Sequence, residues 1–207
     1  MAMESDAGSD SPSVIVLAGP NGAGKSTYAP ALLRRRLGVT EFVNADVIAQ
    51  GLSGFDPEGV ALEAGRIMLG RLDRLAEARA NFAFETTLAS RTFAPWLKSL
   101  SGTGYAVHLV FLYLRSADLA VERVAGRVRL GGHNVPPDTV RRRYDRGLRN
   151  FFSLYQALTT TWRMVDNSMR SSRRILAAGS GRTIRIVHDA AEWNRIREQY
   201  DYDHQTQ

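Results

Sequence analysis

The glycine-rich segment GPNGAGKS, residues 19–26, constrains the fold of this chain more than any other feature. It matches the pattern G-x-x-x-x-G-K-[ST], which chance would produce roughly 0.002 times in a chain of this length and composition. A short apolar, β-branched run, residues 13–19, precedes it, and residues 26–37 read as a helix. A strand, a glycine-rich turn and a helix in this order predict a phosphate-binding loop in an α/β domain.

The residue types of this loop suit the phosphates of a nucleoside triphosphate. Glycines let backbone N–H groups point at an anion, and the helix that starts near Gly24 adds the positive end of its dipole. The ammonium of Lys25 can reach the β- and γ-phosphates as a point charge, and the Ser26 hydroxyl is expected to ligate Mg²⁺. The predicted nucleotide-binding residues are Gly19, Asn21, Gly22, Ala23, Gly24, Lys25, Ser26 and Thr27.

Apolar runs of strand length alternate with helical patterns along the rest of the chain, which predicts a mainly parallel five-stranded sheet in a three-layer α/β domain. The other four strands are expected at residues 40–46, 81–87, 105–114 and 160–166, and the main helices at 58–80, 91–105, 116–130 and 137–160. We expect a loop at residues 47–59, and a C-terminal β-hairpin at 173–189 followed by a helix at 190–200.

Composition indicates one globular domain. The chain has 207 residues, of which 44% are hydrophobic and 23% are charged, and it has no cysteine, so disulfides and thiolate chemistry are excluded. Residues 1–12 form a polar, acidic tail without the features of a secretory signal, and residues 13–207 form the domain. The longest apolar run is too short to span a membrane, so we expect a cytoplasmic protein that does not contact membranes.

The formal net charge of +6 is carried almost entirely by arginine. A net positive charge suits an acidic partner such as a phosphorylated metabolite. The alternative is that the arginines form a solvated surface without a specific partner. Nucleic acid is not the expected partner, because the arginines cluster near a predicted lid and are not interleaved with aromatic residues.

Two carboxylates are predicted at the carboxyl edge of the sheet, where ligands bind in such folds. Asp46 is a candidate general base for the hydroxyl of an acceptor, and its alternative role is to cap the helix that follows it. Glu85 can bind acceptor hydroxyls or a metal-bound water, or it is a plain acid at the end of a strand.

A lid is predicted at about residues 123–146, because arginines cluster there around the flexible segment GGHNVPP. Arginines on a mobile segment can stabilise the charge of a transferring phosphoryl group. Arg127 and Arg143 are the favoured candidates. Helical spacing places Arg142, Arg146 and Arg149 opposite the apolar stripe, toward solvent. His133 is expected to be a loop residue rather than a catalytic one.

With these residues in place, the chain resembles the zeta toxin family of phosphate-loop kinases. The resemblance runs from residue 14 to the last helix through the blocks GPNGAGKSTYA, FVNADVIA, AGRIML, FETTLAS, ERVAGRV, GGHNVP, RRRYDR and VDNS. It implies a fold like that of nucleoside monophosphate kinases, ATP and Mg²⁺ as cofactors, and phosphorylation of the 3′-hydroxyl of the sugar in UDP-N-acetylglucosamine. It also implies inhibition by a small antitoxin, which is not fused to this chain.

The resemblance also implies roles for single residues. Asp46 would be the base, Lys25 and Ser26 would serve ATP and Mg²⁺, and Arg123 would be a lid arginine, while a second lid arginine stays open among Arg127, Arg129 and Arg143. The residues implied at the acceptor are Asn44, Asp46, Glu85, Thr86 and Arg91. The segment at residues 166–168 would lie near the adenine.

The sequence therefore predicts an ATP-dependent small-molecule kinase, with UDP-N-acetylglucosamine as the leading acceptor. The alternatives are a kinase of another hydroxylated metabolite, antibiotic or nucleotide, and a nucleotide-binding regulatory protein that is not a kinase. The chain has no LSGGQ-like segment, which argues against an ABC-type ATPase.

Overall fold

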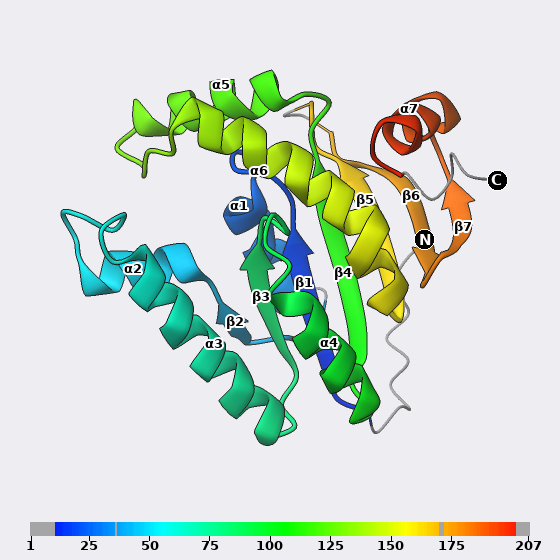
Figure 1. Cartoon of the computed structure of the whole chain (residues 1–207), viewed down its shortest axis with the longest axis horizontal. Helices are drawn as coiled ribbons and strands as arrows, with labels where there is room; N and C mark the ends of the chain where they lie inside the picture. Colours follow the sequence, from blue (N-terminus) through cyan, green and yellow to red (C-terminus); the bar gives the residue numbers. More distant parts are fainter. Residues whose placement is uncertain (1–10, 36, 170–171, 202–207) are drawn as a thin grey trace.

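Seven strands form one sheet in the order β2-β3-β1-β4-β5-β6-β7 in the computed structural model, which describes residues 11–35, 37–169 and 172–201 (Figure 1). The strands are β1 (Ser13–Ala18), β2 (Glu41–Val43), β3 (Phe82–Thr86), β4 (Ala106–Tyr113), β5 (Thr161–Asp166), β6 (Arg174–Ser180) and β7 (Thr183–Val187). Residues 1–10, most of the predicted tail, lie outside the described residues.

The first five strands are parallel, and β6 and β7 extend the sheet as an antiparallel hairpin. Strand β1 is central, with Val16 aligned to Phe84 of β3 on one side and to Leu109 of β4 on the other. Its apolar residues are buried on both faces, as expected for a strand inside a parallel sheet. The predicted α/β fold with five parallel strands and a C-terminal hairpin is confirmed.

Helices cover the sheet and cross the edge where its parallel strands end. They are α1 (Lys25–Ala29), α2 (Ala45–Leu52), α3 (Ala61–Glu77), α4 (Phe93–Gly102), α5 (Ala117–Val128), α6 (Pro137–Asn150) and α7 (Ala190–Tyr200). In Figure 1, α3, α4 and α6 lie in front of the sheet, and α5 lies beyond the tips of the strand arrows. The carboxyl ends of β1 and β3 therefore open into a space framed by helices.

Two segments differ from their sequence-based predictions. Residues 47–52 were expected in a loop but belong to α2, because Asn44 caps this helix by accepting a hydrogen bond from the Asp46 amide at 2.8 Å. The helix predicted to reach residue 160 ends as α6 at Asn150 and continues as a π-helical turn, Phe151–Tyr155, and a 3₁₀ turn, Gln156–Leu158. The apolar stripe continues through these turns and keeps them on the core.

An aromatic cluster joins the C-terminal segment to this core. Trp162 of β5 stacks on Trp193 of α7 with ring centroids 5.6 Å apart, and both rings contact aromatic side chains of the π-helical turn. The burial of these large side chains fixes α7 against the sheet. None of the helices among the described residues has the length and apolar character to cross a membrane.

Candidate functional site

The glycine-rich loop follows β1 and leads into α1, as the sequence predicts. Gly19, Gly22 and Gly24 all have positive φ, at 138°, 78° and 81°. A Cβ atom on Gly22 would lie 2.8 Å from the carbonyl oxygen of Ala120 and 3.1 Å from the Cβ atom of Arg123. Only glycine fits this position, so the loop packs tightly against α5.

Lys25 is buried in this loop. Its Nζ atom donates hydrogen bonds to the carbonyl oxygens of Gly19 at 2.8 Å and Pro20 at 3.0 Å, and it lies 3.6 Å from a carboxylate oxygen of Glu85. Burial lowers the pKa of Lys25, and the carboxylates of Glu85 and Asp46 oppose this change. The ammonium is thus held at the base of the loop by two backbone carbonyls, beside the Glu85 carboxylate.

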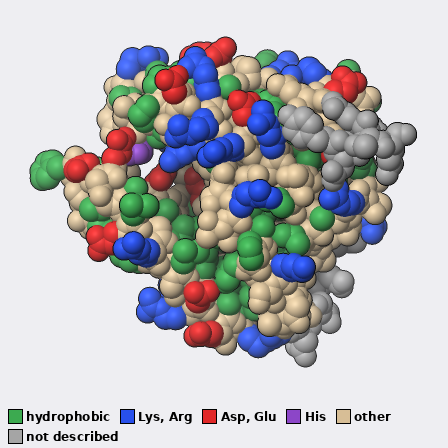
Figure 2. Space-filling model, in the orientation of Figure 1, with side chains coloured by type: hydrophobic (Ala, Val, Ile, Leu, Met, Phe, Trp, Pro, Cys, Tyr) green, Lys and Arg blue, Asp and Glu red, His purple; other side chains and the backbone are tan. Residues whose placement is uncertain are grey.

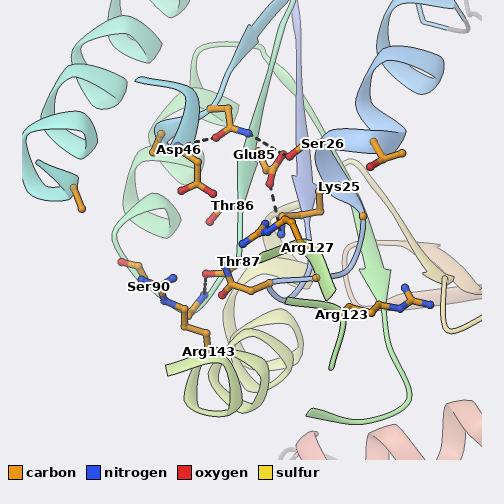
Figure 3. A pocket seen from close by; sticks show the side chains of 18 of the residues that line it. Lys25, Ser26, Asp46, Glu85, Thr86, Thr87, Ser90, Arg123, Arg127 and Arg143 are labelled. Atoms are coloured by element: carbon orange, nitrogen blue, oxygen red, sulfur yellow. Dashed lines mark hydrogen bonds and ion pairs between the residues drawn. The ribbon is translucent and has the colours of Figure 1, made fainter. Parts of the chain in front are cut away.

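Glu85 connects the loop to the neighbouring strand ends. Its Oε2 atom accepts hydrogen bonds from the Ser26 hydroxyl at 2.9 Å and from the Asn44 amide at 3.0 Å, while its Oε1 atom faces Lys25 (Figure 3). A hydroxyl and a carboxylate beside a phosphate-binding loop are hard oxygen ligands, which suit Mg²⁺. The residues present therefore fit a magnesium ion between Ser26 and Glu85.

Asp46 lies in the first turn of α2, with its carboxylate directed into the space in front of β3 (Figure 3). Asn44 caps this helix, so the alternative role for Asp46 as the cap is wrong. The Asp46 side chain is exposed to the cavity and acts electrostatically on Lys25. A carboxylate in this place is available to accept a proton from a bound hydroxyl group.

A cavity of about 1310 Å³ contains these groups and extends beyond them. Figure 2 shows it as a hollow, with acidic side chains inside and basic side chains gathered along one rim. One end is formed by the glycine-rich loop. The other end lies between α3, α6 and the end of β3 with the segment that follows it, which contribute Thr86, Thr87, Ala89 and Ser90. The cavity is large enough for two substrates side by side.

The three arginines singled out in the sequence occupy different places along the cavity. Arg127 points at Lys25 and Glu85, whereas Arg143 lies beside Thr87 at the far end (Figure 3). The guanidinium of Arg123 donates a hydrogen bond to the carbonyl oxygen of Ser168 at 2.7 Å. Arg127 is thus the one of these three that stands at the phosphate end beside the lysine.

The other predicted arginines differ in whether they line the cavity. Arg142 and Arg146 are exposed, as predicted, and they also line the cavity. Arg91 is exposed and is not among the residues that line the cavity, although the neighbouring Ser90 is. Arg129 lies at the cavity rim.

The sequence analysis did not predict one wall of the cavity, formed by α3, or the Arg173–Tyr28 contact at the opposite end. An apolar face of α3 lines the end of the cavity away from the glycine-rich loop, through Ala61, Leu62, Gly65, Met68 and Leu69. The sequence shows that this helix is amphipathic. It does not distinguish the apolar residues that line the cavity from those that pack on the core. At the other end, Arg173 stacks on Tyr28 of α1 with its guanidinium carbon 4.6 Å from the ring centroid.

The segment after β5 lies against the glycine-rich loop. The Asn167 side-chain amide donates to the carbonyl oxygen of Ala23 at 2.7 Å, and the Asp166 carboxylate accepts from the Ser168 amide at 2.8 Å. Both Asn167 and Arg173 line the cavity beside Gly24. They define the end of the cavity that is farthest from Arg143.

The chain was compared with models of known protein families. Residues 14–154 match the model of the family described as AAA domain (AAA_33). An uncharacterized protein of Haemophilus influenzae is 28% identical over 130 residues, which are 63% of this chain and 91% of that protein.

Solved structures show the same fold. A chain from the PezAT chromosomal toxin-antitoxin system of Streptococcus pneumoniae gives a TM-score of 0.66 at 17% identity, covering 94% of this chain and 80% of that chain. The structure of AvrRxo1-ORF1:-ORF2 with ATP gives 0.68 at 16% identity, and the match covers 90% of this chain but only 63% of that chain. The kinase-like fold and the likeness to zeta toxins expected from the sequence are confirmed at the level of fold.

Proposed function

Because this chain belongs to the AAA domain family, and its glycine-rich loop shares a cavity with a free carboxylate, we propose that it is an ATP-dependent small-molecule kinase. The observation that carries the proposal is the position of Asp46. Its carboxylate faces the cavity next to Lys25, where a hydroxyl group near a γ-phosphate would need a base.

The chain's own residues divide the work of phosphoryl transfer. The loop amides and Lys25 would bind the phosphates, while Ser26 and Glu85 would hold Mg²⁺, which would neutralise charge on the phosphate oxygens. Asp46 accepts the proton of the acceptor hydroxyl as its oxygen forms a bond to the γ-phosphorus, and the bond from that phosphorus to the ADP oxygen breaks. Arg127 stabilises the charge of the transferring group.

We propose UDP-N-acetylglucosamine as the acceptor. The acceptor end of the cavity combines hydroxyl groups of Thr86, Thr87 and Ser90, the guanidinium of Arg143 and an apolar wall on α3. Such a surface suits a molecule with sugar hydroxyls, an anionic group and a flat base. Asn44 and Glu85 border this end, so they are in place to contact acceptor hydroxyls as well. A kinase of another hydroxylated metabolite fits the same cavity and is the second candidate.

The test is incubation of the protein with Mg·ATP and UDP-N-acetylglucosamine, with product detection by mass spectrometry. Asp46→Asn keeps the shape of the side chain but removes the base, so we expect the rate to fall by roughly 10²- to 10⁴-fold while ATP still binds. Asp138→Asn, at an exposed acid at the start of α6, is the matched control and should behave as wild type.

The outcomes separate the candidates. Unchanged UDP-N-acetylglucosamine with intact ATP binding would overturn the acceptor and lead to a screen of metabolites. ATP binding with no transfer to any acceptor would favour a nucleotide-binding regulatory protein.

A protein partner is part of the proposal. The PezAT structure is described as a toxin-antitoxin system, and AvrRxo1-ORF1 was solved with AvrRxo1-ORF2. On this likeness we propose that a separate antitoxin protein binds this chain. Growth arrest on expression of wild type but not of Asp46→Asn would support a toxic activity that needs such a partner.

A further inference from the structure

The segment Gly131–Asn134 joins α5 to α6 and folds back over the last turn of α5. The Gly131 amide donates to the carbonyl oxygen of Val128 at 2.9 Å, and the Gly132 amide donates to that of Arg127 at 3.0 Å. Gly131 has a φ of 81°. The sequence predicts this segment as a flexible part of a lid between two helices. In the structure it has a definite path against Arg127.

This segment determines where the Arg127 side chain can go. The Arg127 Nη2 atom donates to the carbonyl oxygen of His133 at 2.8 Å. A Cβ atom on Gly132 would lie only 2.5 Å from Arg127 Cγ and 3.1 Å from the Arg127 carbonyl oxygen. The backbone at Gly132 thus packs against the aliphatic part of the Arg127 side chain, and the His133 carbonyl binds its guanidinium.

The held guanidinium faces the phosphate end of the cavity. Arg127 contributes to the lowered pKa of Lys25, so the two positive charges act on each other. The Arg127 Nε atom is buried and has no hydrogen-bond partner within the described residues. The ammonium of Lys25 and the guanidinium of Arg127, with its buried Nε–H group, are therefore positioned to bind an anion between them.

The same segment reaches across the mouth of the cavity. The Nε2 atom of His133 lies 3.8 Å from a carboxylate oxygen of Glu58, which belongs to the connection between α2 and α3. In Figure 1 these two connections face each other beyond the ends of the strands. The carbonyl of His133 therefore holds the arginine while its imidazole contacts the opposite arm.

We propose that Gly131–Asn134 is a positioning loop that directs Arg127 at the transferring phosphoryl group, and that His133 and Glu58 latch this loop across the cavity mouth. The proposal rests on the kinase activity proposed above. Gly132 and the His133 carbonyl act through Arg127, so they are positioning groups rather than catalytic ones. The latch retains the nucleotide by tying the two arms of the cavity together.

The positioning role is tested with Gly132→Ala, with Gly70→Ala as the control because a Cβ atom at Gly70 meets open space. We expect Gly132→Ala to lower the rate of ATP turnover, measured without acceptor, by roughly 10- to 100-fold, and to leave Mg·ATP affinity within about threefold. The double variant with Arg127→Ala should be no slower than Arg127→Ala alone. Wild-type turnover in folded Gly132→Ala, or additive losses in the double variant, would overturn the positioning role.

The latch is tested separately, with substitutions at the exposed Glu58 and the partly exposed His133. Glu58→Gln and His133→Ala keep the His133 carbonyl, so turnover should persist while dissociation of a fluorescent N-methylanthraniloyl-ATP becomes about 3- to 10-fold faster. The pair Glu58→Lys with His133→Glu places opposite charges at the two positions and should restore slow dissociation. Glu63→Gln is the control. Unchanged dissociation in both single variants, or no rescue by the swapped pair, would overturn the latch.

These experiments distinguish failure of this inference from failure of the proposed acceptor. The turnover and dissociation experiments use ATP or its fluorescent analogue without an acceptor. They therefore remain decisive if UDP-N-acetylglucosamine is not phosphorylated. A protein that phosphorylates the sugar nucleotide but shows none of the expected changes would keep the proposed function and lose the positioning loop.

Discussion

At the scale of single residues, Glu85 is the group on which the site depends. It is mostly buried, and its two carboxylate oxygens meet Lys25 and Ser26 of the glycine-rich loop and Asn44, which precedes α2. A carboxylate with such partners can hold the lysine and complete a magnesium site at the same time. Its proposed role in metal binding can therefore be tested separately from a proposed role in acceptor binding.

Glu85→Gln should raise the magnesium concentration needed for half-maximal activity by about tenfold and lower the maximal rate by roughly 100-fold, because the metal loses an anionic ligand. The measurement is a magnesium titration of phosphotransfer or ATP turnover, with Glu77→Gln at the exposed end of α3 as control. An unchanged magnesium requirement with a raised acceptor KM would instead place Glu85 at the acceptor.

The sequence could predict some of these residues and not others. The glycine-rich loop follows from a local motif, because its chemistry is set by neighbours in the chain. The choice of Arg127 over Arg143 could not be made, since both lie on predicted lid helices with similar patterns. Their difference depends on how residues 131–134 return over α5, which is a property of tertiary packing.

At the scale of elements, the segment after β3 is shaped by α6 and the turn that follows it. Leu88 is buried with a φ of 56°, an unusual conformation for a branched side chain. Its carbonyl oxygen accepts from the Asn150 side chain at 2.7 Å, and that of Ser90 accepts from the Tyr155 hydroxyl at 2.6 Å. These contacts fix the segment that lines the acceptor end of the cavity.

Tyr155→Phe and Asn150→Asp each remove one donor with little change of shape, so they should raise the KM for the acceptor by about tenfold and leave the KM for ATP nearly unchanged. The Tyr155→Phe change should also cost about 1 kcal/mol of the free energy of unfolding, typical of a lost hydrogen bond. Steady-state kinetics and urea unfolding measure both effects, with Arg149→Ala on the exposed face of α6 as control. Equal changes in the two KM values would mean that the segment does not act on the acceptor alone.

At the scale of the whole molecule, the C-terminal hairpin and α7 complete the side of the sheet opposite β2. Alternation around a glycine turn was enough to predict the hairpin, but its pairing with β5 is a long-range contact that local pattern does not determine. Local sequence pattern also does not determine the polar contacts between α7 and the rest of the domain. Glu192 accepts from the Tyr113 hydroxyl at 2.7 Å, and Asp145 of α6 accepts from the Tyr200 hydroxyl at 2.9 Å.

Buried tyrosines make this arrangement sensitive to alkaline pH. Burial raises the pKa of Tyr144 to about 12 and of Tyr155 to about 12, and it is also the main cause of the raised pKa values of Tyr113 and Tyr200. In the unfolded chain these groups ionise near a pKa of about 10, so above that pH the unfolded state binds fewer protons than the native state. Stability is therefore fully present below pH 10 and falls as the pH rises.

Urea unfolding at a series of pH values should show this loss directly. We expect a constant contribution from these groups between about pH 7 and 9, and above pH 10 a fall of up to about 1.4 kcal/mol per pH unit for each tyrosine. Tyr144→Phe should lower stability at neutral pH, because its hydroxyl donates to the carbonyl oxygen of Leu114 at 2.6 Å, and should make the alkaline slope shallower. An identical slope in wild type and Tyr144→Phe would show that this tyrosine ionises alike in the native and unfolded states.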